Sequence, residues 1–322
     1  METAFTRHTG VQVPLICGPM YPCSNPELVA AVSEAGGLGV VQPVSLTYVH
    51  GHEFRAGLKY TRSLTEKPIG FNALIEASNK TYLDRMRYWI DIALEEGVRF
   101  FITSLGNPKW VCDRVHALHG VVYHDVTERK WAQKGLDGGV DGLIAVNARA
   151  GGHAGPRSPE ALFEELAPFG KPIVSAGGVG TPAEFVRHLQ LGYAAAQLGT
   201  RFIATPECRA SDAYKQAIVD ADEDDIVLTE RLTGVPLAVI RNRYVERLGT
   251  KTGRFARWML KGRKTKHWMR TWYALSAGPR LKKSLMTGDA SSNYWQAGKS
   301  VAGIHETKPA RQIVEEFAAA LE

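Results

Sequence analysis

The sequence has no apolar run near the ~20 residues that a membrane-spanning helix needs. Residues 1–14 also lack the apolar stretch of a secretory signal peptide. The four cysteines, Cys17, Cys23, Cys112 and Cys208, show neither the spacing of metal ligands nor that of a disulfide framework. These absences predict a protein of the reducing cytoplasm that spans no membrane and binds no metal, with inert thiols at Cys17 and Cys23.

The composition is that of a globular protein with many turns. The chain has 322 residues, of which 44% are hydrophobic, and it contains 32 glycines and 16 prolines. A chain of this length buries a sizeable core. Length alone fits either one large barrel or two ordinary domains.

Positive charge is concentrated in one segment. Residues 251–283 contain eleven Lys and Arg and no Asp or Glu, which leaves 28 basic and 33 acidic residues elsewhere. The overall net charge of +6 is therefore misleading as an average, and nucleic acid is an unlikely partner for the whole protein.

Short apolar runs recur along the chain, and each ends near Gly, Pro or Asn before an amphipathic stretch. Continuous apolar runs of this length indicate strands buried on both faces, as in a parallel sheet. Eight such units favour a closed (β/α)8 barrel, although their spacing does not exclude an open doubly wound sheet. The expected strands are Val13–Cys17, Gly39–Gln42, Pro68–Asn72, Arg99–Thr103, Gly120–His124, Gly142–Val146, Pro172–Ala176 and Ala194–Leu198.

Glycines follow the seventh and eighth expected strands. Loops after these strands lie side by side at the C-terminal rim of a barrel, where phosphate groups are commonly held. Gly177, Gly178, Gly199 and Thr200 are the candidate phosphate cradle, because glycine lets backbone N–H groups approach an anion. The alternative is that they form ordinary strand-to-helix turns. The sequence lacks an early GxGxxG and a complete Walker motif, so FMN suits this site better than a dinucleotide or ATP.

A histidine within a glycine-rich loop follows the sixth expected strand. His153 lies among Gly151, Gly152 and Gly155, which lets the backbone bend close to a flat ligand. Its ordinary pKa suits removal of a proton from a carbon acid, or delivery of one to a carbanion. The alternative is a loop histidine that forms only local hydrogen bonds.

Four further residues end expected strands. His124 is a candidate contact to the cofactor ring or substrate, or else a structural histidine. Asn72 either binds the cofactor through its amide or caps a turn. Gly18 and Met20 belong to a rigid turn that would place backbone against the ring.

These motifs together resemble the nitronate monooxygenase family, formerly called 2-nitropropane dioxygenases, to which flavin-dependent enoyl-ACP reductases and some NADH:quinone reductases are related. The resemblance covers nearly the whole chain. It rests on Pro14–Met20, Ala35–Gly39, Gly70–Asn72, Ala150–Gly155, Ser175–Gly178, Gln197–Phe202 and Trp295–Ser300. It implies an FMN-binding barrel with an extra C-terminal part and with His153 as the catalytic acid/base. The implied FMN-binding residues are Asn72, Gly151, Gly178, Gln197, Leu198, Gly199 and Thr200.

The resemblance implies oxidation of alkyl nitronates or nitroalkanes by O2 to carbonyl compounds and nitrite. The alternative activity is NAD(P)H-dependent reduction of an enoyl or related acyl thioester of ACP or CoA, or of a quinone. One departure concerns the run before Ala150, where Val146-Asn-Ala-Arg149 replaces the usual Gln-Gly-x-Glu. Arg149 is therefore a candidate substrate-binding cation that selects an anionic substrate.

Three segments are expected. Residues 1–204 form the FMN-binding barrel core, and residues 205–290 form a helical, basic, Trp-rich insertion over the catalytic face. Residues 291–322 supply a loop beside the flavin and the closing helix. The basic segment 251–283 either docks an acyl thioester or carrier protein, or packs its tryptophans on the barrel with its charges in water. A monomer or homodimer is expected.

Overall fold

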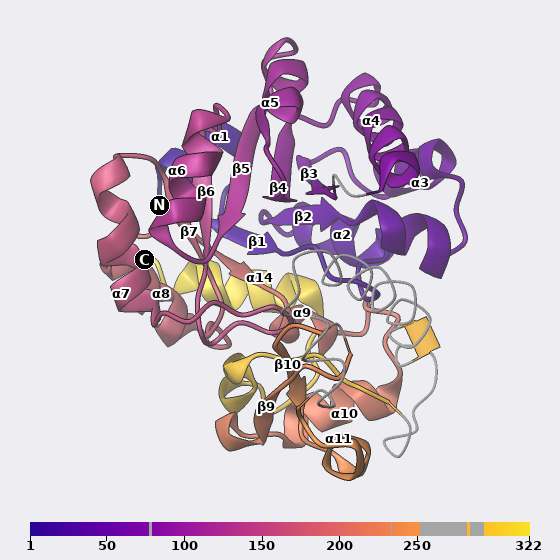
Figure 1. Cartoon of the computed structure of the whole chain (residues 1–322), viewed down its shortest axis with the longest axis vertical. Coiled ribbons are helices and arrows are strands. Elements are labelled where there is room, and N and C mark those ends of the chain that lie inside the picture. Colours follow the sequence, from indigo (N-terminus) through magenta and orange to yellow (C-terminus); the bar gives the residue numbers. More distant parts are fainter. Residues whose placement is uncertain (77–78, 233, 252–281, 284–292) are drawn as a thin grey trace.

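Eight parallel strands close into a barrel at the centre of the molecule (Figure 1). The computed structural model describes residues 1–76, 79–232, 234–251, 282–283 and 293–322. Each strand pairs with the next, and β8 pairs with β1, which confirms the expected TIM barrel over an open sheet. The strands are β1 (Leu15–Cys17), β2 (Leu38–Val41), β3 (Ile69–Ile75), β4 (Phe100–Leu105), β5 (Val121–Val126), β6 (Gly142–Val146), β7 (Ile173–Ala176) and β8 (Ala195–Leu198).

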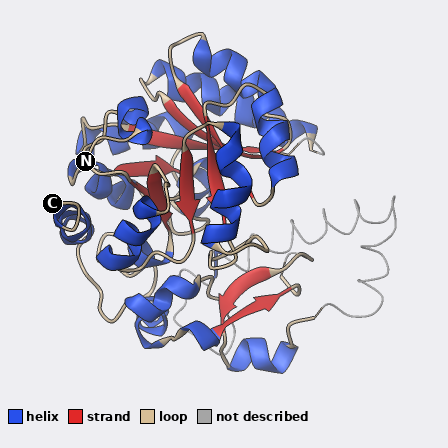
Figure 2. Ribbon diagram, turned by 90° about the vertical axis from the view of Figure 1, so that its left-hand side faces the viewer, coloured by secondary structure: helices blue, strands red, loops and turns tan. Residues whose placement is uncertain are grey.

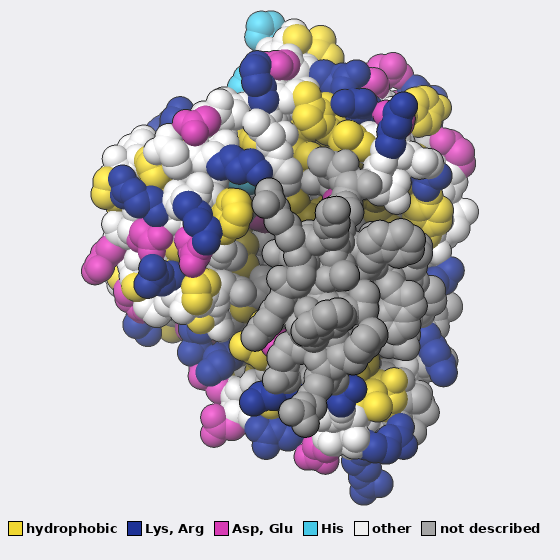
Figure 3. Space-filling model, viewed as in Figure 1, with side chains coloured by type: hydrophobic (Ala, Val, Ile, Leu, Met, Phe, Trp, Pro, Cys, Tyr) yellow, Lys and Arg dark blue, Asp and Glu magenta, His cyan; other side chains and the backbone are white. Residues whose placement is uncertain are grey.

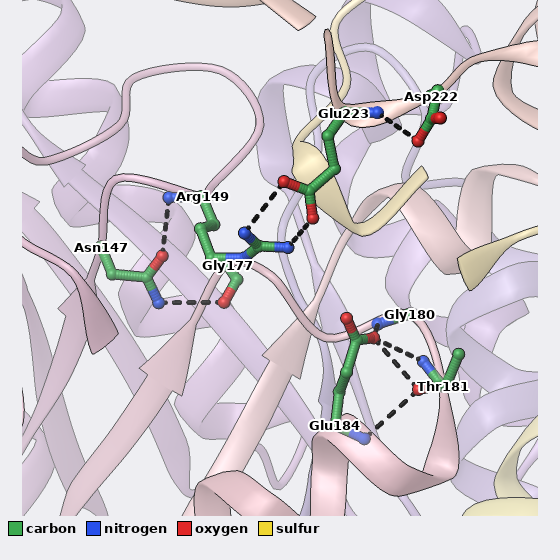
Figure 4. Close-up of polar contacts among 8 residues, drawn as sticks. All are labelled: Asn147, Arg149, Gly177, Gly180, Thr181, Glu184, Asp222 and Glu223. Carbon is green, nitrogen blue, oxygen red and sulfur yellow. Dashed lines mark hydrogen bonds and ion pairs between the residues drawn. The ribbon is translucent and has the colours of Figure 1, made fainter. Parts of the chain in front are cut away.

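Helices follow the first seven strands and cover the outside of the barrel. They are α2 (Pro26–Glu34), α3 (Phe54–Leu64), α4 (Lys80–Glu95), α5 (Lys109–His116), α6 (Arg129–Asp137), α7 (Pro159–Leu166) and α8 (Pro182–Gln190), with short turns at η1 (Ser45–Val49) and η2 (Ala167–Phe169). The start of α8 is fixed by a capping box, in which Thr181 accepts from the Glu184 N–H and Glu184 accepts from Thr181 (Figure 4).

The eighth helix around the barrel comes from the C-terminal end of the chain. After β8 only the short α9 (Thr200–Ile203) follows, and the chain then leaves the barrel. It returns through η4 (Lys299–Gly303) to α14 (Ala310–Ala319), which packs against both α2 and α8. Both termini consequently lie on the same side of the molecule in Figures 1 and 2.

The part of the chain between α9 and η4, here called the excursion, contains a small sheet as well as helices. Its described elements are α10 (Asp212–Asp220), η3 (Glu223–Asp225), β9 (Ile226–Thr229), β10 (Leu237–Ile240) and α11 (Arg243–Leu248). The two strands are antiparallel and lie beyond the barrel (Figure 2). The expectation of a helical insertion is therefore wrong for residues 226–240, because two β-branched runs flank a turn that contains Gly234 and Pro236. Most of the basic segment, residues 252–281, lies outside the described residues, so its role stays a prediction.

The N-terminal end of the barrel is closed. Helix α1 (Ala4–Thr9) places Phe5 edge-on against Phe100, with ring centroids 5.6 Å apart, and against Tyr123 at 6.3 Å. These rings belong to the apolar cluster that fills the barrel interior. The opposite, C-terminal end is thus the one left for a ligand, as is typical of this fold.

The described surface is mixed in charge. Figure 3 shows Lys and Arg side chains interspersed with Asp and Glu on the face that it draws. Among the described helices, none combines the length and apolarity needed to cross a bilayer.

Candidate active site

A cavity of about 310 Å³ lies at the C-terminal ends of the strands. Its walls come from the loops after β1, β5, β6, β7 and β8, and from the C-terminal excursion. This volume is within the range of small-molecule sites. The predicted residues that line it are Gly18, Met20, Arg149, Gly151, His153, Gly178, Gln197, Leu198, Gly199 and Thr200.

The side of the cavity after β7 is shaped by glycine backbone. Gly177 has a φ of 115°, and a Cβ there would lie 2.5 Å from the Ala150 nitrogen. Gly178 has a φ of 82°, and its Cβ would lie 2.7 Å from Nε of Arg149. Left-handed φ and close backbone approach both require glycine at these positions.

Asn147 joins the loops after β6 and β7 (Figure 4). Its side chain is buried and donates to the Gly177 carbonyl at 2.9 Å, while its Oδ1 accepts from the Arg149 N–H at 2.8 Å. Asn147 belongs to the run Val146–Arg149, which differs from the usual Gln-Gly-x-Glu. Its two hydrogen bonds therefore fix how the loops after β6 and β7 lie against each other.

The returning C-terminal segment packs directly on the loop of His153. A Cβ on Gly151 would lie 2.8 Å from the Gly298 nitrogen, and Lys299 N–H donates to the Arg149 carbonyl at 2.9 Å. The Thr200 hydroxyl oxygen accepts from the Gly298 N–H at 3.0 Å, which leaves its own hydrogen for a ligand.

His153 lies exposed at the edge of the cavity, with Nδ1 3.2 Å from the Pro236 carbonyl oxygen. Because a carbonyl only accepts, Nδ1 carries the hydrogen and Nε2 holds the free lone pair. Partial burial lowers the pKa of His153, and the bond to Pro236 opposes this in part. The imidazole is thus predominantly neutral at pH 7, with Nε2 available as a base.

Arg149 is paired, which its sequence context did not reveal. Its guanidinium donates two hydrogen bonds to the Glu223 carboxylate, one of them at 3.1 Å (Figure 4). Both side chains are about one-third exposed, at 30% and 35%. The selection of an anionic substrate by Arg149 stays a prediction, and Glu223 offsets part of the charge on which it depends.

His124 is not in the cavity, contrary to expectation. The side chain is buried, packs against Gly135 of α6, and shares a 2.8 Å hydrogen bond with Thr103. Burial lowers the pKa of His124 to about 4. Strand β5 continues to Val126, so its alternation turns His124 outward and presents the next residue, Asp125, to the cavity.

Two further residues named from the sequence, Asn72 and Cys23, are buried. Asn72 is 6% exposed inside the barrel, with Nδ2 3.5 Å from the Ile102 carbonyl, and it is not among the residues that line the cavity. Cys23 lines the cavity, but its contact with Cys208 and its burial raise the pKa of its thiol. The low thiolate content fits the prediction of an inert cysteine.

The cavity walls fit a flavin nucleotide. Gln197 Oε1 and Asp125 Oδ1 are buried in these walls and accept no hydrogen bond from any described group. Such acceptors match a ligand that brings N–H or O–H donors. The glycine backbone supplies an anion cradle on the other side. Asp125 was missed in the sequence because expected strand five was ended two residues early.

A closed barrel with a glycine-rich cavity at its C-terminal rim is an arrangement typical of enzymes that bind a phosphate-bearing ligand there. The chain belongs to the nitronate monooxygenase family, whose model matches residues 2–319, and this confirms the resemblance. Members of this family are flavin-dependent oxidoreductases, and the chain is an enzyme of that kind.

Individual relatives differ in their activities. The chain is 27% identical to (3aS,4S,5R,7aS)-5-hydroxy-7a-methyl-1-oxo-octahydro-1H-indene-4-carboxyl-CoA dehydrogenase of Mycobacterium tuberculosis, over 98% of this chain and 94% of the relative. It is 30% identical to nitronate monooxygenase of Pseudomonas aeruginosa, over 76% and 81% respectively. The structure of FabK from Thermotoga maritima superimposes with a TM-score of 0.81 at 25% identity, over 99% of this chain and 96% of FabK.

Proposed function

We propose that the protein is an FMN-dependent enzyme that oxidises nitroalkanes and their nitronates with O2, giving carbonyl compounds and nitrite. The observation that carries the proposal is His153 at the cavity edge, with Nδ1 held by Pro236 and Nε2 available as a base. Membership of the nitronate monooxygenase family supports it.

The chain's own residues have separate tasks in this proposal. The backbone at Gly177, Gly178 and Gly199, with the Thr200 hydroxyl, would hold the single phosphate of FMN. Bound flavin supplies a two-electron acceptor that O2 can reoxidise. His153 Nε2 takes the proton from the carbon that bears the nitro group.

The charges in the cavity favour a neutral substrate. Arg149 is offset by Glu223, and Asp125 adds an acid to the same cavity. Among the described lining residues, none provides an uncompensated cation for a preformed nitronate. A neutral nitroalkane, deprotonated by His153 within the site, therefore suits these walls better.

Oxidation or reduction of an acyl thioester is the second candidate. The M. tuberculosis indene-carboxyl-CoA dehydrogenase matches 98% of this chain, whereas the P. aeruginosa nitronate monooxygenase matches 76%. The carbon beside a thioester is also a carbon acid, so His153 would act on it in the same way. This alternative includes NAD(P)H-dependent reduction of an enoyl thioester, with the thioester docked through residues 251–283. NAD(P)H-dependent reduction of a quinone is a related activity.

Anaerobic mixing separates the candidates. The purified protein is mixed in turn with a nitroalkane, its preformed nitronate, an acyl-CoA, an enoyl-CoA with NADH or NADPH, and each nicotinamide alone, while flavin absorbance is followed. Bleaching by the nitro compounds alone supports the proposal, with the neutral form expected to bind more tightly than the nitronate. Bleaching by acyl-CoA or by a nicotinamide, with nitro compounds inert, overturns it in favour of the second candidate.

FMN itself is tested by releasing the cofactor with heat and identifying it by mass. Recovery of FAD, or of no flavin, contradicts the phosphate cradle proposed here. A cytoplasmic location and a monomeric or homodimeric state stay predictions from the sequence.

A further inference from the structure

Asp125 presents an acid to the cavity at the end of β5. We propose that Asp125 contacts the redox-active ring of the bound flavin and makes its reduction potential fall more steeply with pH near neutrality. The inference rests on the proposed FMN site, but it concerns a residue to which neither the family resemblance nor the proton transfer by His153 assigns a role.

The fold places Asp125 two strands away from the glycines after β7. Strand alternation turns Tyr123 and Asp125 inward and His124 outward. Strand β6 separates β5 from β7, where the glycine cradle begins. With the phosphate at β7 and β8, Asp125 faces the part of the ligand away from the phosphate. A carboxylate beside the phosphate would also be repelled by it.

Among the described residues, none compensates the Oδ1 oxygen of Asp125. Its Oδ1 is buried, and no described group donates a hydrogen bond to it. Burial raises the pKa of Asp125 to about 7, without an attractive charge nearby to oppose the shift. An acid that the fold leaves unpartnered in a cavity is typical of a ligand-binding group.

The neighbouring titratable groups are accounted for. Tyr123 lies below Asp125 in the barrel interior, and burial raises its pKa further above its ordinary value. His124 faces α6, and Arg149 is paired with Glu223. Cys23 and Tyr214 also line the cavity, and burial contributes to raised pKa values for both. His153 also lines the cavity, and burial lowers its pKa below the ordinary value of a histidine, so it is included in the test.

Ionised Asp125 can accept a hydrogen bond from the N–H at the polar edge of the flavin ring. Addition of two electrons increases negative charge on that ring, which an adjacent carboxylate disfavours. A proton taken from solvent onto Asp125 removes this repulsion. Reduction near pH 7 is therefore coupled to proton uptake by Asp125, and the potential falls more steeply as the pH rises.

The experiment measures the reduction potential of the flavin in the holoenzyme by equilibration with reference dyes, over about two pH units on either side of 7. Asp125→Asn should have the higher potential at the alkaline end and should converge with the wild type at the acid end. Asp113→Asn, the same change at an exposed acid paired with Lys109 on α5, should match the wild type throughout. The potential of His153→Asn should depend on pH in the same way as that of the wild type. A potential for Asp125→Asn that equals the wild type, or differs by a constant amount, overturns the proposal.

Thermal unfolding of the flavin-free protein gives a second readout. The pKa of Asp125 is about 7 in the folded chain, against ~3.9 for an unfolded aspartate, so stability falls as the pH rises from about 4 to 7. Asp125→Asn and Asp125→Leu should therefore unfold at higher temperature than the wild type at neutral pH, with a smaller difference in acid. Lower unfolding temperatures for both variants would make Asp125 a structural residue and overturn the proposal.

Failure of the proposed function and failure of the role proposed for Asp125 give different results. Protein that takes up no flavin contradicts the proposed function itself. Protein that binds FMN and oxidises nitroalkanes, while its potential is insensitive to Asp125→Asn, contradicts this inference alone.

Discussion

The two sides of the cavity are built in different ways. After β7 and β8 the wall contains Gly177, Gly178 and Gly199, and Gly177 and Gly178 adopt positive φ values of 115° and 82°. After β5 and β6, the wall carries the side chains of Asp125, Arg149 and His153. One side is suited to hold an anion and the other to exchange protons.

This difference explains what each side tolerates. A backbone wall is fixed by steric exclusion, so one added methyl group disturbs it. The side-chain wall is fixed by partners from the distant excursion, since Pro236 holds His153 and Glu223 holds Arg149. Damage to the first should reduce cofactor retention, whereas damage to the second should change turnover and substrate preference.

The largest expected effect lies on the side-chain wall. His153→Asn should retain FMN but lower kcat with a neutral nitroalkane by about 10²–10⁴-fold, as expected for a lost general base. In the wild type, kcat/KM for the nitroalkane should fall as the pH drops below the lowered pKa of His153, since the protonated ring cannot accept a proton. With preformed nitronate as substrate, both effects should be much smaller. Unchanged nitroalkane turnover in His153→Asn would remove the residue from the mechanism.

On the backbone wall, Gly177→Ala should weaken FMN binding by about tenfold or more, corresponding to at least ~1.4 kcal/mol. The added Cβ would lie 2.5 Å from the Ala150 nitrogen, so the loop after β6 has to move. Equilibrium titration of flavin fluorescence measures the loss.

Gly97→Ala is the matched control for this change. Gly97 also has a positive φ, of 82°, but no atom lies within 4 Å of its added Cβ. Both variants carry backbone strain of about 1–3 kcal/mol, and only Gly177→Ala disturbs the cavity. Equal FMN affinities would show that the glycine wall does not hold the cofactor.

A smaller effect is expected at His124, the residue before Asp125. His124→Asn should lower the free energy of unfolding by about 1–3 kcal/mol, because a buried hydrogen bond to Thr103 is lost. Its kcat should stay within about twofold of the wild type, since the side chain faces α6. Denaturant unfolding and steady-state kinetics test the two parts, and a large loss of kcat in a stable variant would place His124 in the site after all.

The smallest effect concerns substrate charge. Glu223→Gln should free the Arg149 guanidinium and lower KM for a nitronate by about threefold, within the energy range of partly exposed ion pairs. KM for the neutral nitroalkane should not change. Glu160→Gln breaks a comparable pair with Arg187 on the barrel surface and serves as the control. An equal decrease in KM for both substrates would show that charge is not the cause.

Much of the fold was predictable because its signals are local. Each apolar run coincides with a strand to within three residues at either end, as with the run expected at Pro68–Asn72 and observed as β3 at Ile69–Ile75. The closing helix α14 was also expected at the C-terminus. Strands β9 and β10 were missed because they follow the polar stretch at residues 220–225 and lie outside the strand–helix alternation of the barrel.

The candidate site was predictable only where its chemistry is carried by glycine patterns. The motifs around Gly178 and Gly199 led to residues that do line the cavity. His124 was misplaced because the end of β5 is not marked by Gly or Pro, and alternation reverses the direction of a side chain at every step. Asn72 was likewise expected at the cavity, but it is buried within the barrel.

By itself the sequence determined the barrel, the glycine wall and the presence of His153 at its rim, since strand period, turn residues and motif spacing are local properties of the chain. Tertiary structure alone decided that Nδ1 of His153 contacts the Pro236 carbonyl, that Arg149 is paired with Glu223 and that Asp125 lines the cavity. The partners responsible are Pro236 and Glu223, which lie 83 and 74 residues from the groups they hold. Contacts over such separations depend on how the excursion folds back over the barrel, and no local pattern encodes them.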